Sequence, residues 1–172
     1  MSLVLLIGGA RSGKSRLAVT LAQRTEAPVV FVATGEPGDD EMIARIRRHR
    51  DERPPEWTTV EEPLDLEEAL AGAAPGATCV VDCLSLWVAN LIESRPPEEI
   101  EAAGAAAARS AAERSGLTIA VTNEVGLGIV PANELARRYR DVLGRVNADW
   151  ADAAAEAHLV VAGRTLPLAR PA

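Results

Sequence analysis

Residues 8–15 read Gly-Gly-Ala-Arg-Ser-Gly-Lys-Ser and follow directly on a short apolar run, Leu3–Ile7. This is the spacing of a phosphate-binding loop, in which glycines let backbone N–H groups wrap around phosphate oxygens. A helical pattern comes next, as such a loop requires. Lys14 is the only lysine in the chain, and we expect it to reach the outer phosphates of a nucleotide while the Ser15 hydroxyl binds Mg²⁺. The motif predicts phosphoryl-transfer chemistry.

Three acidic residues follow apolar or extended segments and are candidates for the same site. Asp82 comes after the run Cys79–Val81, where a carboxylate would hold Mg²⁺ directly or through water. It could instead cap the helix that begins near Ser85. Glu61 could contact a nucleotide or be a solvated charge. Glu124 precedes a Gly-rich loop that ends in proline, and it is either catalytic or a partner for backbone donors.

A basic segment, residues 45–53, contains five arginines, two acids and one of the two histidines, His49, in a chain of net charge −7. Met42, Ile46 and His49 recur at helical spacing, which predicts that His49 shares an inward face with two apolar residues. Neighbouring cations disfavour the imidazolium and would stabilise charge on a phosphate under attack. A neutral histidine there suits covalent nucleotidyl transfer. The alternative is a structural histidine on a solvated helix.

Strand-like and helix-like segments alternate along the whole chain. The five continuous apolar runs expected to be buried strands are Leu3–Ile7, Val29–Ala33, Cys79–Val81, Thr118–Thr122 and His158–Ala162. Helices are expected near residues 14–25, 40–50, 64–72, 84–94, 97–115 and 132–157. This alternation predicts an α/β fold of the P-loop NTPase type, a mostly parallel sheet flanked by helices on both faces. Its length predicts one nucleotide-binding domain, residues 1–172. Ligands bind at the carboxyl ends of such strands.

Composition and charge narrow the class of protein further. A net charge of −7 argues against binding to nucleic acid or to anionic membranes. No stretch approaches the ~20 apolar residues that span a bilayer, and no targeting segment is apparent. Cys79 and Cys83 match neither a zinc site nor a disulfide framework, so we expect buried core residues in a reducing compartment. The sequence predicts a cytoplasmic protein.

With these motifs together, the chain resembles the bifunctional adenosylcobinamide kinase/adenosylcobinamide-phosphate guanylyltransferase family of cobalamin biosynthesis. The His-containing helix and the segment after Thr122 are more specific than the phosphate loop, which many enzymes share. The matching segments are GGARSGKS at 8–15, VATGE at 32–36, DDEMIARIRRHRDERP at 39–54, WTTVEEP at 57–63, VDCLSLWVANL at 81–91 and TNEVGLGIVPANELARRYRDVLGRVN at 122–147.

The resemblance implies two reactions. The enzyme would phosphorylate adenosylcobinamide with ATP or GTP, and then transfer GMP from GTP to adenosylcobinamide phosphate through a guanylylated histidine, releasing pyrophosphate. It implies that His49 is the catalytic histidine and that the protein is a homotrimer. Lys14 as a catalytic cation and Ser15 and Asp82 as Mg²⁺ ligands follow from the motif and the strand end described above. The implied nucleotide contacts are Gly8, Gly9, Ala10, Arg11, Ser12, Gly13, Lys14, Ser15, Ala33, Thr34, Gly35, Arg50, Asp51, Glu52, Arg53, Glu61 and Asp82.

Two other functions are compatible with the phosphate loop. One is a monofunctional small-molecule kinase in which His49 is structural. The other is a nucleotide-dependent switch without a second substrate, against which the cluster of His49 and arginines argues, because a switch needs no nucleophile. The sequence identifies neither the residues that bind the corrinoid nor the preference for ATP or GTP.

Overall fold

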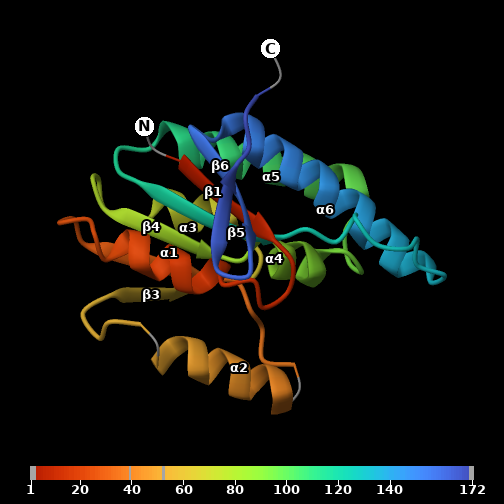
Figure 1. Cartoon of the computed structure of the whole chain (residues 1–172), viewed down its shortest axis with the longest axis horizontal. Coiled ribbons are helices and arrows are strands. Elements are labelled where there is room, and N and C mark those ends of the chain that lie inside the picture. Colours follow the sequence, from red (N-terminus) through yellow and green to blue (C-terminus); the bar gives the residue numbers. More distant parts are fainter. Residues whose placement is uncertain (1–2, 39, 52, 171–172) are drawn as a thin grey trace.

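The computed structural model has a single seven-stranded sheet in the order β3-β2-β4-β5-β1-β6-β7 (Figure 1). It describes residues 3–38, 40–51 and 53–170, and only the backbone of Glu41, Met42, Arg45 and His49. Every strand pair is parallel except the last, β6 with β7. The strands are β1 (Leu3–Gly8), β2 (Val29–Ala33), β3 (Thr58–Glu61), β4 (Thr78–Asp82), β5 (Thr118–Asn123), β6 (Glu156–Val161) and β7 (Arg164–Pro167). The predicted fold class is confirmed.

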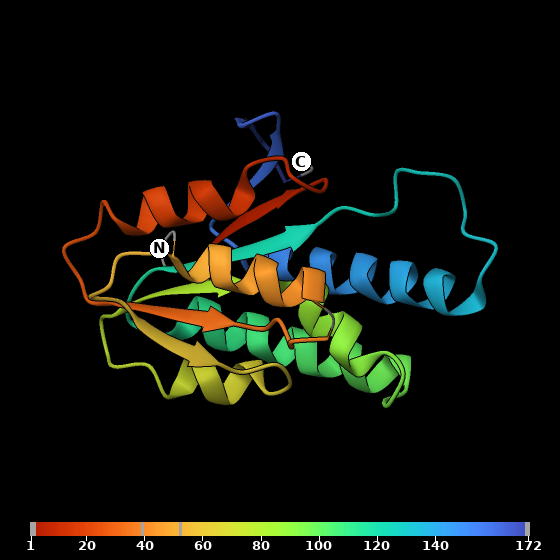
Figure 2. The same cartoon turned by 90° about the horizontal axis from the view of Figure 1, so that it is seen from below.

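Helices cover both faces of the sheet, as predicted, but unequally. They are α1 (Lys14–Ala22), α2 (Asp40–Asp51), α3 (Leu66–Ala71), α4 (Leu84–Leu91), α5 (Pro97–Glu113) and α6 (Glu134–Ala153). Figure 2 shows α1 on one side of the sheet and α3, α4, α5 and α6 on the other. Because both faces are covered, the central strands must be apolar throughout, which is why they appear as continuous runs.

Two apolar clusters hold these layers together. One joins α3, α4, α5 and α6 to the sheet around fully buried Trp87 and Trp150, and the other joins α1 to the opposite face through Leu6, Ala18 and Val160. The core is built mostly of aliphatic side chains, in line with an aromatic content of only 3%. Within the described residues, no helix has both the length and the apolar character needed to cross a bilayer.

The structure differs from the predicted elements at several boundaries, most of all around the last helix. Two short strands, β3 and β7, were not predicted; both lie at edges of the sheet. The last helix ends at Ala153 rather than at residue 157, and β6 begins at Glu156, two residues before the predicted strand. The helix also starts later than predicted, after Asn133, whose side chain accepts a hydrogen bond from the N–H of Ala136 at 3.0 Å.

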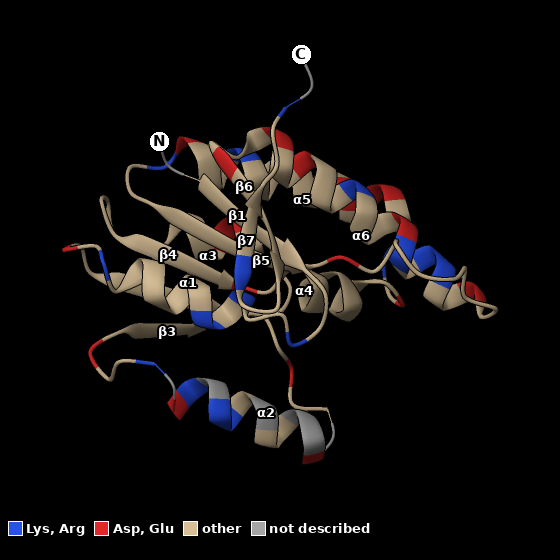
Figure 3. Cartoon of the chain, viewed as in Figure 1, with Lys and Arg blue, Asp and Glu red and all other residues tan. Residues whose placement is uncertain are grey.

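Helix α2 stands apart from the other helices, beyond β3 and at the opposite end from the chain termini (Figure 1). It connects β2 to β3. The segment before α2 leaves the carboxyl end of β2, and the segment after α2 enters the amino end of β3, the strand at the edge of the sheet. Figure 3 shows basic residues along α2, whereas the strands of the sheet are almost uncharged. This arrangement brings a charged helix to the end of the sheet where ligands bind in such folds.

Candidate functional site

The phosphate loop connects the end of β1 to the start of α1, and two of its glycines are sterically required. Gly13 has φ of 102°, a left-handed conformation that side chains disfavour. A Cβ on Gly8 would collide with the carbonyl oxygen of Val160 in the neighbouring strand β6. The loop is also held from outside, because the N–H of Gly163 in the β6–β7 turn donates to the carbonyl oxygen of Ser12 at 2.8 Å.

Lys14 lies folded along this loop. Its side chain is buried, and Nζ donates to the carbonyl oxygen of Gly9 at 2.6 Å and to Oγ of Ser12 at 3.3 Å. The ammonium group is bound by these two loop oxygens, and we expect phosphate oxygens to replace them as its partners when a nucleotide binds. The loop therefore presents its cation without a large rearrangement of the backbone.

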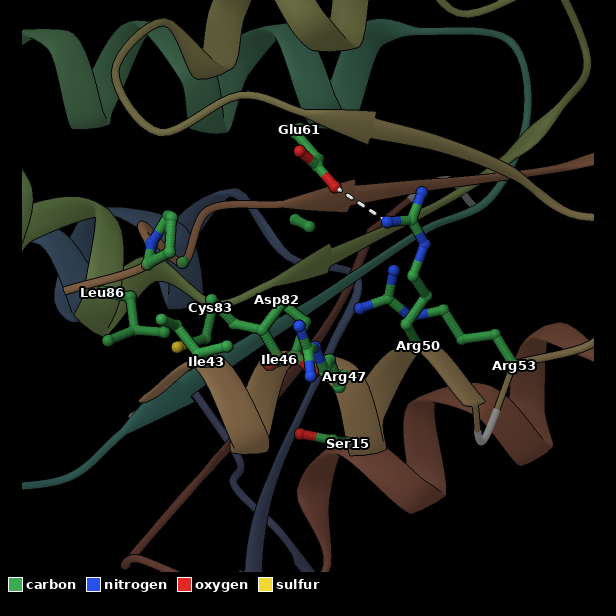
Figure 4. A pocket seen from close by; sticks show the side chains of 13 residues that line it. Ser15, Ile43, Ile46, Arg47, Arg50, Arg53, Glu61, Asp82, Cys83 and Leu86 are labelled. Carbon is green, nitrogen blue, oxygen red and sulfur yellow. Dashed lines mark ion pairs between the residues drawn. The ribbon is translucent and has the colours of Figure 1, made fainter. Parts of the chain in front are cut away.

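A cavity of about 230 Å³ opens beside the loop at the carboxyl ends of β2, β3 and β4 (Figure 4). Strands, loops and α2 all contribute to its wall. The lining residues are Ser15, Ala33, Gly35, Pro37, Ile43, Ile46, Arg47, Arg50, Arg53, Glu61, Asp82, Cys83 and Leu86. Parallel strands end together at one edge of a sheet, so residues far apart in the sequence meet here.

Asp82, the last residue of β4, lines the same cavity as Ser15. Helix α4 has Cys83 rather than Asp82 as its N-cap residue, so the alternative of a helix cap has no support in the geometry. Buried Thr34 fixes the chain at this point: its Oγ1 donates to the carbonyl oxygen of Cys83 at 2.7 Å and accepts from the N–H of Cys83 at 2.8 Å. These two hydrogen bonds fix the backbone of Cys83 next to Asp82.

Arg50, near the end of α2, and Arg53, just beyond it, are held in different ways. Arg50 pairs with Glu61 at 3.5 Å between Nη1 and Oε1, and both side chains are largely exposed. The guanidinium of Arg53 stacks 3.6 Å from the ring centroid of Phe31 and donates to Oγ1 of Thr59 at 3.4 Å. Burial lowers the pKa of Arg53, and the Asp82 carboxylate opposes that shift. Arginine nevertheless stays cationic in proteins, so the cavity keeps a fixed positive charge.

The predicted site residues are only partly brought together. Thr34 is buried behind the wall, Asp51 is exposed on α2, and Glu52 lies outside the described residues. The backbone of His49 lies in α2 between Ile46 and Arg50, which both line the cavity, but its side chain lies outside the described part. Seven of the predicted contacts line the cavity: Ser15, Ala33, Gly35, Arg50, Arg53, Glu61 and Asp82.

Six lining residues were not predicted from the sequence: Pro37, Ile43, Ile46, Arg47, Cys83 and Leu86. Arg47 belongs to the basic segment that the sequence singles out, and its position three residues before Arg50 was the available signal. Ile43, Ile46, Cys83 and Leu86 lie within the matched segments 39–54 and 81–91, and Pro37 lies just before the first of them. Their place in the cavity wall becomes clear only from the structure, where α2 and α4 lie beside the ends of the strands.

Glu124 and Cys79 lie outside the cavity, whereas Cys83 forms part of its lining. The N–H of Glu124 donates to the carbonyl oxygen of Gly8 at 3.1 Å, and its carboxylate accepts a hydrogen bond from the N–H of Gly126. The geometry therefore favours the second interpretation of Glu124, a partner for backbone donors. Cys79 and Cys83 are buried, as expected for core residues, and burial raises the pKa of the Cys79 thiol.

Proteins from three bacteria are similar to this chain over almost its whole length. The Pseudomonas aeruginosa bifunctional adenosylcobalamin biosynthesis protein CobP is 43% identical over 165 residues, which cover 95% of each chain. The CobU proteins of Escherichia coli and Salmonella typhimurium, with the same description, are 41% and 42% identical; each alignment covers 94% of this chain and 96% of the relative.

The fold has a structural relative as well. A solved structure from Pyrococcus horikoshii OT3 superposes with a TM-score of 0.57, covering 96% of this chain and 85% of the other at 7% sequence identity, which is evidence for the fold alone. The model of one sequence family, described as cobinamide kinase / cobinamide phosphate guanyltransferase, matches residues 4–168. With its phosphate loop, the adjoining cavity and relatives above 40% identity over almost its whole length, the chain belongs to the cobinamide kinase / cobinamide phosphate guanyltransferase family.

Proposed function

We propose that this enzyme phosphorylates adenosylcobinamide with ATP or GTP and then transfers GMP from GTP to adenosylcobinamide phosphate, giving adenosylcobinamide-GDP and pyrophosphate. The observation that carries the proposal is the shared cavity, in which α2, the helix that bears His49, faces Ser15 of the phosphate loop and Asp82 of β4. A monofunctional kinase would not need an arginine-rich helix at this place. The bifunctional descriptions of the relatives support the same choice.

In the first reaction the loop 8–15 holds the outer phosphates through its backbone N–H groups and Lys14. The hydroxyl oxygen of the aminopropanol arm forms a bond to the γ-phosphorus as the bond to the nucleoside diphosphate breaks. Catalysis of this kind depends on positioning and on charge stabilisation more than on covalent chemistry. The buried position of Lys14 supports that role, because a cation held in place needs little reorganisation during the reaction.

In the second reaction a nitrogen of the His49 imidazole attacks the α-phosphorus of GTP, and pyrophosphate leaves. A phosphate oxygen of adenosylcobinamide phosphate then attacks the phosphorus of the guanylylated histidine. The P–N bond breaks and the imidazole is released. Arg47, Arg50 and Arg53 line the cavity and would stabilise the negative charge that gathers on the phosphorus oxygens. Glu61, paired with Arg50, is in a position to orient that guanidinium or to accept hydrogen bonds from a ribose.

The described residues fit Mg²⁺ as the metal. Ser15 and Asp82 supply a hydroxyl and a carboxylate to one cavity, and oxygen donors are what Mg²⁺ prefers. Among the described residues no group of three or more metal-binding side chains occurs, which suits a metal bound largely by substrate phosphates and water. When bound, Mg²⁺ would neutralise charge on the phosphates.

Asp82→Asn should weaken the metal dependence while leaving the fold intact. Asparagine keeps the size of the side chain but removes the negative charge, so we expect the Mg²⁺ concentration for half-maximal kinase rate to rise about tenfold or more. A Mg²⁺ titration of the kinase rate, with a thermal melt of the same protein, measures both. An unchanged titration together with a loss of about 1 kcal/mol of stability would instead indicate a helix cap.

The proposed function is tested by mass spectrometry of the intact protein after incubation with GTP and Mg²⁺. A mass increase of one guanylyl group that disappears when adenosylcobinamide phosphate is added identifies the transferase. A monofunctional kinase would convert cobinamide and give no adduct. A switch would give neither an adduct nor nucleotide turnover that cobinamide stimulates.

We also infer a homotrimer formed of single-domain chains, residues 1–172, in the cytoplasm. The loop between β5 and α6 projects from the molecule (Figure 2), and within it Leu127 and Ile129 are 87% and 98% exposed. Exposed apolar side chains that cluster in this way are typical of interaction surfaces. Cys79 and Cys83 are buried core residues without a disulfide, which supports a reducing compartment. Light scattering measures the molar mass in solution, and a monomer at micromolar concentration would contradict the trimer.

A further inference from the structure

Phe31, the only phenylalanine in the chain, lies at the centre of β2 and outside the lining of the cavity. Its side chain is only 2% exposed, and the guanidinium of Arg53 lies over the ring, 3.6 Å from its centroid. Thr59 is the partner of Phe31 in the register of β2 with β3, so both side chains lie on the same face of the sheet. Together they contact Arg53, and we call them the Phe31–Thr59 pair.

The ring is the stronger of the two contacts. Nη1 of Arg53 donates to Oγ1 of Thr59 at 3.4 Å, which is long for a hydrogen bond. The buried Nε of Arg53 has no hydrogen-bond partner within the part of the chain that the structure describes. A cation over an aromatic face is attracted electrostatically, and more strongly where water is excluded. The position of the Arg53 guanidinium therefore depends chiefly on Phe31.

The Phe31–Thr59 pair also keeps Arg53 from pairing with a nearby carboxylate. Asp82 attracts the guanidinium, because it opposes the fall in the pKa of Arg53 that burial causes. The ion pairs between described residues nevertheless include Arg50 with Glu61 and none between Arg53 and Asp82. Arg53, which lines the cavity, thus remains available for phosphate oxygens.

The same contact fixes the end of α2. The N–H of Arg53 donates to the carbonyl oxygen of Arg50 at 3.2 Å, so Arg53 is joined to the last turn of the helix. Helix α2 lies apart from the other helices (Figure 1). The ion pair of Arg50 with Glu61 joins two largely exposed side chains, and such pairs add little stability. The stacked Arg53 is therefore the firmer link between this end of α2 and the sheet. His49 lies four residues before Arg53, about one helical turn.

We propose that Phe31 and Thr59 are positioning residues for guanylyl transfer that act through Arg53, an inference that rests on the proposed function. They line no part of the cavity and touch no substrate. Their contribution is to hold the guanidinium in place before GTP binds, so that little reorganisation is needed when charge develops at the α-phosphate. Cobinamide phosphorylation depends on the phosphate loop instead, so the pair should matter far more for the second reaction than for the first.

The first test compares adduct formation with GTP and the kinase rate in Phe31→Leu, which removes the ring but keeps an apolar side chain in the core. We expect the rate of adduct formation to fall about tenfold, with the kinase rate at saturating ATP and Mg²⁺ within about twofold of wild type. Ile119→Val is the matched control. Ile119 is fully buried in the same cluster but lies in β5, two strands away from β2, so its variant should form the adduct at the wild-type rate.

A double-mutant cycle shows whether Phe31 acts through Arg53. Arg53→Ala removes the guanidinium, so Phe31→Leu should cause no further fall in the rate of adduct formation in that background. An equal fall in both backgrounds would overturn the inference, and so would a wild-type rate in Phe31→Leu. Equal losses of kinase and adduct rates in Phe31→Leu would also overturn it, because the ring would then support only the fold.

Thr59 provides a test that does not depend on a core substitution, because it is half-buried in the edge strand β3. Thr59→Val removes the hydroxyl and should slow adduct formation about threefold, whereas Thr59→Ser keeps the hydroxyl and should restore the rate. Equal rates in these two variants would overturn the inference if Phe31→Leu fails to fold. In each case a wild-type protein that forms the adduct leaves the proposed function standing. A wild-type protein that forms none would overturn the proposed function and this inference with it.

Discussion

Replacing Lys14 with alanine is expected to lower the rate of cobinamide phosphorylation by about 10²–10³-fold, the usual loss for one preorganised charge contact. No other lysine exists in the chain to take its place. The side chain is only 6% exposed and is held between the carbonyl oxygen of Gly9 and Oγ of Ser12. The cation is therefore positioned before the nucleotide arrives, and its loss cannot be compensated from solution.

Lys14→Arg keeps the positive charge of the side chain but changes its shape, so this variant tests whether charge alone is sufficient. The planar guanidinium is wider than an ammonium group and presents its donors in a fixed fork, so we expect it not to fit the narrow space along the loop and to restore little activity. Arg24→Ala is the control, because it removes one exposed positive charge just beyond the other end of α1. A kinase rate within tenfold of wild type for Lys14→Ala would contradict the assignment.

The phosphate loop could be predicted because its determinants are local. Glycine at residue 13 is required by a left-handed backbone, and the strand before it and the helix after it are encoded within a few residues on either side. The buried strands β2, β4 and β5 were predicted for a similar reason, since helices on both faces demand apolar residues throughout.

The edge strands could not be predicted in this way. Side chains of β3 and β7 are half-buried or exposed, so neither strand has the continuous apolar pattern of the centre, and β7 ends in a proline that edge positions tolerate. The end of α6 was missed because Ala153, Ala154 and Ala155 offer no helix-breaking residue. There the chain turns into β6 through tertiary pairing with β1.

In the candidate site too, residues within local motifs could be predicted from the sequence, whereas residues brought together by tertiary packing could not. Ser15, Asp82 and Arg50 were predicted because each lies in a motif or at a strand end. Leu86 and Ile43 were not, because they look like ordinary core residues in the sequence. Only the position of α2 across the ends of the strands brings these two side chains into one cavity.

His49→Ala and His49→Asn are expected to eliminate both the covalent GMP adduct and guanylyl transfer. The physical reason is that no group can then form the covalent intermediate, whereas phosphorylation of cobinamide needs the loop and the metal but no protein nucleophile. Kinase activity should largely survive. The adduct of the wild-type protein should be stable in base and labile in acid, as a phosphoramidate is.

His158→Ala is the matched control, because His158 is the only other histidine in the chain. It lies in β6, away from the cavity lining, with Nε2 3.1 Å from Oε2 of Glu156. Its variant should form the adduct at the wild-type rate. An adduct that still forms in both His49 variants would move the nucleophile elsewhere. Equal loss of kinase and transferase activity would indicate instead that His49 maintains the structure of α2, and the arginines that line the cavity would then serve the kinase reaction alone.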